Sequence, residues 1–233
     1  MEDREEGRFA PEEFLDLART DHAGVFAQGE PVWSAIGRIG DYLADRDGFD
    51  QRGEIAEGAH VGERVHLGEG VKVEPGAVVN GPAWIGSGTV IRTGAYIRGN
   101  VVTGADCVLG NSCEFKNCLL FDGCQVPHFN YVGDSILGHK AHLGAGVILS
   151  NVRLDHAEVQ VRIDGGDNRG SGLRKFGAVV GDNVEIGCNS VINPGAIIGR
   201  RSVLYPGSMW SGVLAEDHIV KVRQVQQVVL RKG

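Results

Sequence analysis

Between residues 109 and 151 the chain concentrates side chains that could carry out chemistry. The sequence Val126-Pro-His128-Phe-Asn-Tyr131 places a histidine and a tyrosine within four residues. Histidine exchanges a proton near neutral pH, so His128 is a candidate general base. Composition alone favours a plainer interpretation, in which His128 is a surface residue beside a stabilising aromatic. The elements that hold His128 must decide between the two.

An apolar residue recurs every six positions through the first half of the chain. Many of these hexads carry Gly one or three places later, where a tight turn uses it at no steric cost. One hexad cannot bury its apolar residue alone, so the repeats must stack into a solenoid with a continuous interior. All of these eleven positions except Thr103 are apolar: Ile55, Val61, Leu67, Val73, Val79, Ile85, Ile91, Ile97, Thr103, Leu109 and Phe115.

The six-residue pattern continues after Phe115, disappears from about residue 153 to residue 175, and resumes at Val180. Three hexads make one triangular coil, so the pattern predicts roughly seven or eight coils. Repeats of the form Ile/Leu/Val-Gly-x-x-small-x resemble the left-handed parallel β-helix family. The left hand comes from this resemblance and is an exception to the right-handed crossover rule. The expected fold is therefore an all-β, left-handed parallel β-helix.

Bulk properties exclude several classes of protein. The formal net charge is -7 at pH 7, so we expect no nucleic-acid partner. We also expect no membrane association, since no apolar run approaches roughly 18 residues and the acidic start of the chain is not a signal peptide. Five cysteines, mostly at small-residue positions of the repeat, fit a reducing cytoplasm. Their spacing does not pair thiolates, so no metal site is expected.

The chain divides into three predicted parts. Residues 1–50 hold apolar residues at helical spacing and predict two short helices that cap or flank the first coil. Residues 51–212 form the β-helix. An alternating segment with an Asp-Gly turn interrupts it around 155–173 and predicts a hairpin arm. Residues 213–233 form a C-terminal tail whose apolar spacing fits either a strand or a helix.

The polar residues of the repeat region resemble a known active site. His128-x-x-Tyr131-x-Gly-Asp134, followed by Leu143-Gly-Ala-Gly146 and Asn151, is similar to the acetyltransferase domain of the bifunctional glucosamine-1-phosphate acetyltransferase/N-acetylglucosamine-1-phosphate uridylyltransferase. It is closer still to archaeal-type sugar-1-phosphate nucleotidylyltransferases that carry this domain. The match covers about residues 55–210. It implies an acetyl-CoA-dependent N-acetyltransferase for an amino-sugar phosphate such as glucosamine-1-phosphate or galactosamine-1-phosphate.

The resemblance implies a role for each matching position. His128 corresponds to the general base, and Ala145 to the residue whose backbone N–H meets the acetyl-CoA thioester. Attack of an amine on a thioester needs a neutral amine and a stabilised oxyanion, which suits these groups. Cations suit a phosphate. The implied substrate-binding residues are the phosphate-binding Arg98, Lys116 and Lys175, together with Tyr131, His142 and Asn151.

The sequence departs from the family at two points. His142 replaces an Asn that contacts the sugar in the relatives, which leaves the acceptor open. The nucleotidyltransferase domain has no counterpart, because about fifty helical-looking residues stand before the repeats, so uridylyl transfer is not expected. The family builds its sites between neighbouring subunits. The resemblance therefore implies a homotrimer in which Lys175 and the arm reach an adjacent chain.

Three other functions stay open at this point. A non-catalytic scaffold or regulatory subunit would share the fold, although it would have no reason to keep the polar residues. An acyltransferase for a nucleotide-linked amino sugar would keep both the fold and the polar residues. A β-helical carbonic anhydrase would need a His pair about five residues apart and a distant third ligand. Here His139 and His142 are three apart, which disfavours the zinc enzyme.

Overall fold

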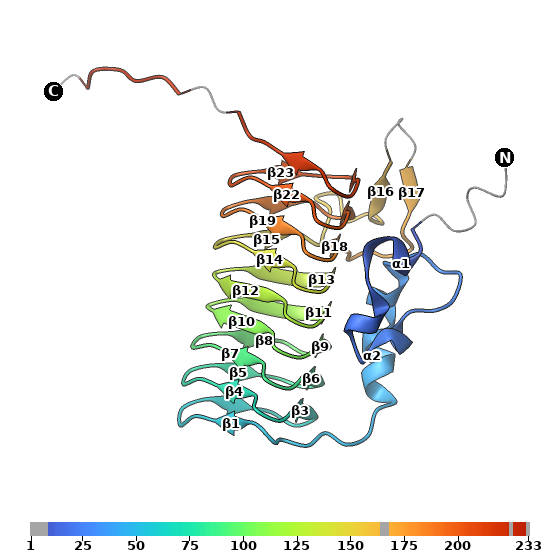
Figure 1. Ribbon diagram of the computed structural model, residues 1–233, viewed down its shortest axis with the longest axis vertical. Coiled ribbons are helices and arrows are strands. Elements are labelled where there is room, and N and C mark those ends of the chain that lie inside the picture. The colour runs from blue at the N-terminus through green and yellow to red at the C-terminus, as the bar shows by residue number, and fades with distance from the viewer. Residues whose placement is uncertain (1–8, 164–167, 224–225, 232–233) are drawn as a thin grey trace.

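The computed structural model describes residues 9–163, 168–223 and 226–231. Most of them form short parallel strands stacked coil upon coil into a prism with three side faces (Figure 1). Nine described strands stack along the first face, so the solenoid has about nine turns rather than seven or eight. The difference arises because paired strands continue beyond Leu204, where the pattern in the sequence fades.

The first face of the prism is a single parallel sheet. Its strands, in order, are β1 (Glu54–Ile55), β4 (Lys72–Val73), β7 (Val90–Ile91), β10 (Val108–Asn111), β12 (Gln125–His128), β14 (His142–Leu143), β19 (Glu185–Ile186), β22 (Val203–Leu204) and β25 (Ile219–Val220).

The second face runs beside it in the same coils. Its strands are β2 (His60–Val61), β5 (Val78–Val79), β8 (Tyr96–Ile97), β11 (Glu114–Leu120), β13 (Tyr131–Leu137), β15 (Ile148–Leu149), β20 (Val191–Ile192) and β23 (Met209–Trp210).

The third face shares two long strands with the second, because β11 and β13 bend around the corner between them. Its other strands are β3 (Val65–Leu67), β6 (Ala83–Ile85), β9 (Val101–Thr103), β18 (Ala178–Val180), β21 (Ala196–Ile198) and β24 (Val213–Leu214).

The residues of the six-residue pattern fill the interior of the prism. Leu67, Ile97 and Phe115 are fully buried, as the period predicts. Ile55 is an exception at 40% exposed, because it lies in the terminal coil. Cys107, Cys113, Cys118 and Cys124 are buried in or beside this core, and Cys188 is exposed.

The N-terminal segment lies along the third face and not over the first coil (Figure 1). It contains α1 (Pro11–Phe14), η2 (Leu17–Arg19), η3 (Ala23–Val25) and α2 (Ser34–Ala44). The sequence predicts helices that cap or flank the first coil; they flank several coils instead, because the third face is apolar on its outside, and the end of α2 reaches the first coil where Arg64 donates to the Leu43 carbonyl. The outward residues buried under the segment are Val102, Leu119, Ile136, Val179 and Ile197.

The arm is an antiparallel pair of β16 (Gln160–Arg162) and β17 (Asn168–Gly170). The turn expected at Asp164-Gly165 lies outside the described residues. The base of the arm is fixed, since Val159 and Val161 are fully buried. In the C-terminal tail, β25 is a strand and the described residues after it form no helix or strand.

Two properties of the described residues bear on function. None of their helices has both the length and the apolar character that crossing a membrane requires. No group of three or more His, Cys, Asp or Glu side chains among them could hold a metal ion.

Candidate functional site

His128 lies at the corner between the first and second faces, at the end of β12. Its side chain is exposed, while its backbone is fixed on both sides. The His128 N–H donates to Oδ1 of the buried Asn130 at 3.1 Å, and its carbonyl accepts from the Gly146 N–H at 3.0 Å. Nδ2 of Asn130 donates to the Gly144 carbonyl at 2.7 Å. His128 and Ala145 therefore occupy neighbouring coils of one corner.

Only the carbonyl side of the Ala145 backbone is hydrogen-bonded among the described residues. Its carbonyl accepts from the Asn189 N–H of the next coil at 2.8 Å. Its own N–H donates to no acceptor in the part of the chain that the structure describes. A fixed, unused amide N–H is the kind of group that stabilises an oxyanion. The corner thus combines a possible base with a possible oxyanion donor.

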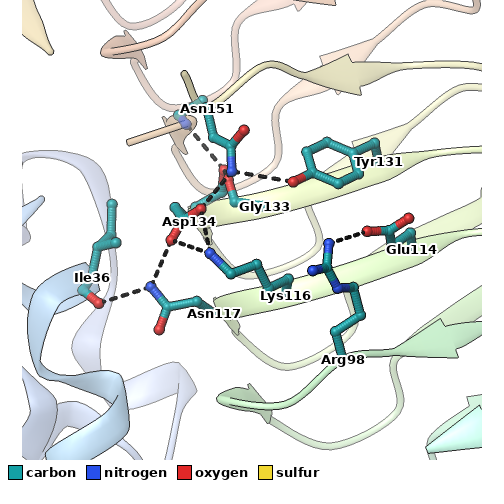
Figure 2. A network of polar contacts seen from close by, with 11 residues as sticks. Ile36, Arg98, Glu114, Lys116, Asn117, Tyr131, Gly133, Asp134 and Asn151 are labelled. Carbon is teal, nitrogen blue, oxygen red and sulfur yellow. Dashed lines mark hydrogen bonds and ion pairs between the residues drawn. The ribbon is translucent and has the colours of Figure 1, made fainter. Parts of the chain in front are cut away.

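A buried carboxylate organises the opposite edge of the second face (Figure 2). Asp134 is 3% exposed and accepts hydrogen bonds from three side chains. Nζ of Lys116 lies 3.1 and 3.2 Å from its oxygens, Nδ2 of Asn117 lies at 3.0 Å, and Nδ2 of Asn151 also donates to it. Two residues that the resemblance implies, Lys116 and Asn151, are therefore held by one residue to which the sequence assigned no role.

The backbone at this corner explains why Asp134 can occupy it. Asn100, Asn117 and Asp134 stack on successive coils, 17 residues apart, with φ of 52°, 47° and 47°. Asn and Asp tolerate this left-handed conformation better than other side chains except Gly. The 17-residue spacing is a signal in the sequence that could have identified the stack.

Tyr131 points outward from β13 and reaches across the face toward Asn151 (Figure 2). Its hydroxyl accepts a hydrogen bond from Nδ2 of Asn151 at 3.1 Å. Tyr131 can lie there because residue 133 is Gly, where a Cβ would stand 2.5 Å from the tyrosine oxygen. Burial raises the pKa of Tyr131, so its hydroxyl stays protonated at neutral pH and can donate to a ligand.

Arg98 follows β8, one coil before Lys116. Its Nη1 lies 2.8 Å from Oε1 of Glu114, and both side chains are well exposed, at 44% and 36%. Arg98 and Lys116 are thus each paired with a carboxylate inside the chain. A phosphate placed between these two cations would share them with Glu114 and Asp134.

Lys175 lies beside Asn151 although the arm separates them in sequence. The N–H of Phe176 donates to the Asn151 carbonyl at 3.0 Å, so the chain returns to the point from which it left the coil. The Lys175 side chain is exposed and forms no ion pair among the described residues. The five residues Arg98, Lys116, Tyr131, Asn151 and Lys175 therefore gather along one edge of the second face.

His142 lies elsewhere. It points outward from β14 on the first face, and its Nδ1 is 2.6 Å from Oε2 of Glu185. The corner at Ala145 separates it from Tyr131 and Asn151 within one chain. The structure therefore does not bring His142 together with the other expected substrate-binding residues.

Two family profiles match parts of the chain. Residues 79–164 match the profile described as "GMPPB C-terminal domain". Residues 177–209 match the profile described as "Bacterial transferase hexapeptide (six repeats)". Together with the stacked parallel coils, the second match confirms the expected fold class, a left-handed parallel β-helix of hexapeptide repeats.

Curated relatives align with part of the chain. The bifunctional sugar-1-phosphate nucleotidylyltransferase/acetyltransferase of Sulfurisphaera tokodaii is 41% identical over 88 residues, which cover 38% of this chain and 22% of that protein. The bifunctional protein GlmU of Methanococcus vannielii is 40% identical over 80 residues, 34% of this chain and 19% of that protein. The chain thus spans about a fifth of the length of these relatives.

A solved structure of the UDP-N-acetylglucosamine acyltransferase from Campylobacter jejuni aligns with a TM-score of 0.31 and 18% identity, over 73% of this chain and 68% of that one. The sequence matches, and not this structural alignment, support the resemblance described under Sequence analysis. They confirm that the chain is a hexapeptide-repeat β-helix, part of which is homologous to bifunctional nucleotidylyltransferase/acetyltransferases.

Proposed function

We propose that this chain is an acyltransferase that moves an acetyl group from acetyl-CoA to the amino group of an amino-sugar phosphate. The observation that carries the proposal is the second face, where a polar, cation-bearing edge stands opposite the corner of His128 and Ala145. The hexapeptide-repeat match and the homology to an acetyltransferase-containing relative support a transferase.

In this proposal the corner of His128 and Ala145 catalyses the acyl transfer. His128 takes a proton from the amine as its nitrogen attacks the thioester carbonyl and the new C–N bond forms. The carbonyl oxygen becomes an oxyanion that accepts a hydrogen bond from the free N–H of Ala145. The C–S bond then breaks, and the thiolate of coenzyme A leaves and takes up the proton from His128.

The opposite edge holds the acceptor. Lys116 and Asn151 are oriented by the buried carboxylate of Asp134, and Arg98 and Lys175 add positive charge beside them. These groups suit a phosphate, because charge-assisted hydrogen bonds to phosphate oxygens are stronger than neutral ones. In this proposal the Tyr131 hydroxyl, which lies 3.1 Å from Nδ2 of Asn151 at the same edge, contacts the sugar.

We also propose that the active form is a cytoplasmic homotrimer. The N-terminal segment already covers the third face, whereas the second face leaves large apolar side chains exposed. Tyr96, Ile148 and Met209 are 41%, 36% and 76% exposed there, and Phe129 at the adjacent corner is 60% exposed. An exposed apolar surface beside a polar site suits contact with further copies of the chain. The free cysteines suit a reducing compartment.

A thiol-release assay tests the proposed reaction. The protein is mixed with acetyl-CoA and a panel of amino-sugar phosphates, and the free thiol is measured with time. We expect His128→Ala to lower kcat by roughly 10²–10⁴-fold, the usual worth of a positioned base. His60→Ala removes an exposed histidine from a distant coil and serves as the matched control. Near-normal turnover by His128→Ala would contradict the assignment.

A further inference from the structure

A cavity of about 520 Å³ opens between the base of the arm and the coils that follow the candidate site. It adjoins that site, since Ser150 forms part of its wall and directly precedes Asn151. The polar side chains of its lining that matter here are Ser150, Arg153, Gln160, Arg162, Asn193 and Ser211.

The wall that the arm contributes is held rigidly against the prism. Gly195 has φ of +78°, and a Cβ there would stand 2.6 Å from the Gln160 carbonyl. Gly212 has φ of +89°, and a Cβ there would stand 3.0 Å from the carbonyl of Arg162. These two glycines let β16 lie directly on the coils, and the buried Val161 fixes it there. The side chains of Gln160 and Arg162 therefore project from a fixed strand.

The cavity, like the neighbouring site, has one more cation than carboxylates. Arg98 and Lys116 are each paired with a carboxylate. In the cavity, Nε of Arg153 lies 2.8 Å from Oδ1 of Asp155, whereas Arg162 forms no ion pair within the described ranges. Two arginines and one aspartate leave the lining with a net charge of +1. This local excess, on a chain with a net charge of -7, favours an anion.

The size and the remaining lining indicate more than a phosphate. The amine and the phosphorus of a 2-amino-sugar 1-phosphate are four bonds apart, about 5 Å. The second face alone can therefore bind such an acceptor, without the cavity. A volume of about 520 Å³ lies within the range of pockets for whole small molecules. The amides of Gln160 and Asn193 offer donors and acceptors for a base, and two serine hydroxyls suit a ribose.

We propose that this cavity binds the nucleoside diphosphate part of the acceptor, so that the acceptor is an amino sugar linked to a nucleoside diphosphate. Arg162 binds the phosphate farther from the sugar, Arg153 supports it, and the amide and hydroxyl groups contact the nucleoside. This inference rests on the proposed function, because it names the acceptor class of the same site.

Calorimetric titration of the full chain tests the cavity without turnover. The probes are uridine diphosphate, guanosine diphosphate, inorganic pyrophosphate and glucosamine-1-phosphate. We expect at least one nucleoside diphosphate to bind about tenfold or more tightly than pyrophosphate, and Arg162→Gln to weaken that binding by about tenfold or more. Lys72→Gln makes the same change of charge on an exposed residue of the first face and should leave binding unchanged.

The outcomes separate this inference from the proposed function. If neither nucleoside diphosphate binds more tightly than pyrophosphate, or if Arg162→Gln binds as the natural chain does, the cavity assignment is overturned. Acyl transfer to glucosamine-1-phosphate without nucleotide binding would refute the cavity and keep the function. Arg162-dependent nucleotide binding without acyl transfer to any amino sugar would keep the cavity and refute the function.

Discussion

Replacing Asp134 by Asn tests whether one buried carboxylate positions the acceptor-binding residues. The two side chains have nearly the same shape, and Asn also accepts the left-handed backbone that residue 134 requires, with φ of 47°. The change therefore leaves the corner intact. It removes the negative charge opposite Lys116 and puts an NH₂ group where a carboxylate oxygen accepted hydrogen bonds.

The expected loss follows from the contacts of Asp134. Its carboxylate accepts from Lys116, Asn117 and Asn151, whereas an amide offers one oxygen for these donors. Each hydrogen bond that involves a charged group contributes about 1.5–3 kcal/mol. The Lys116 side chain is 26% exposed, so its unpaired ammonium is partly desolvated. We expect Lys116 and Asn151 to lose their fixed positions.

Steady-state kinetics with varied acceptor measure the effect. We expect Asp134→Asn to raise KM for the acceptor by about 10–100-fold, which corresponds to about 1.4–2.8 kcal/mol. We expect kcat to change little, because the His128 and Ala145 contacts lie at the other corner of the face. Thermal unfolding of the same variant should show a lower midpoint.

An unchanged or lower KM would refute this reasoning. It would mean that Asp134 merely neutralises Lys116 and competes with the phosphate for it. Asp217→Asn is the matched control, because Asp217 also has a positive φ of 60° and accepts from Arg201, but on an exposed surface. Exposed ion pairs contribute only about 0–1 kcal/mol to stability, so the control variant should keep the acceptor KM of the natural chain.

Three further outcomes are expected. Gly133→Ala places a methyl group 2.5 Å from the Tyr131 oxygen, so it should displace that ring and raise acceptor KM, whereas Gly24→Ala, with nothing closer than 3.9 Å, should not. The pKa of His22 is lowered to about 4 by burial and then by Arg46, below its unfolded value of 6.5, so the folded state resists protonation. Stability should therefore be lost as pH falls from about 6.5 to 4, and thermal melts of His22→Gln should show a weaker pH dependence; an equal dependence would exclude His22 as the cause. Met209→Glu, at an exposed position of the second face, should shift light-scattering mass from trimer toward monomer, and a natural chain that is an active monomer would contradict the trimer.

The fold was largely readable in the sequence because a solenoid repeats one local rule. The inward residue of each hexad must be apolar, so the period alone identified Leu67, Ile97 and Phe115 as core. The position of the N-terminal segment depends on the outside of the third face, which the period does not describe. The sequence did contain a signal for an apolar outer surface on the third face. In the apolar pairs Leu119-Leu120 and Ile136-Leu137 the first residue of each pair points outward.

The candidate site was readable where the resemblance supplied a spacing. That spacing marked Lys116, Tyr131 and Asn151, which the structure brings together across β13. It gave no role to Asp134, since a carboxylate in a turn has many ordinary explanations until its partners are seen. Arg162 was equally hidden, because the position of the arm depends on two corner glycines far along the chain.

The docking of the N-terminal segment on the third face has a consequence for how the protein is made. The segment is synthesised before the coils, yet it packs against Ile197 of β21, and the N–H of Asp16 donates to Asp182 at 2.6 Å, 166 residues away. About 150 residues must follow α2 before this surface exists, which takes roughly 8–30 s at about 5–20 residues per second. During that interval the apolar side chains of Leu15, Trp33 and Ile36 lack their final partners. A segment made before the coils can therefore complete its packing only after most of the coils exist.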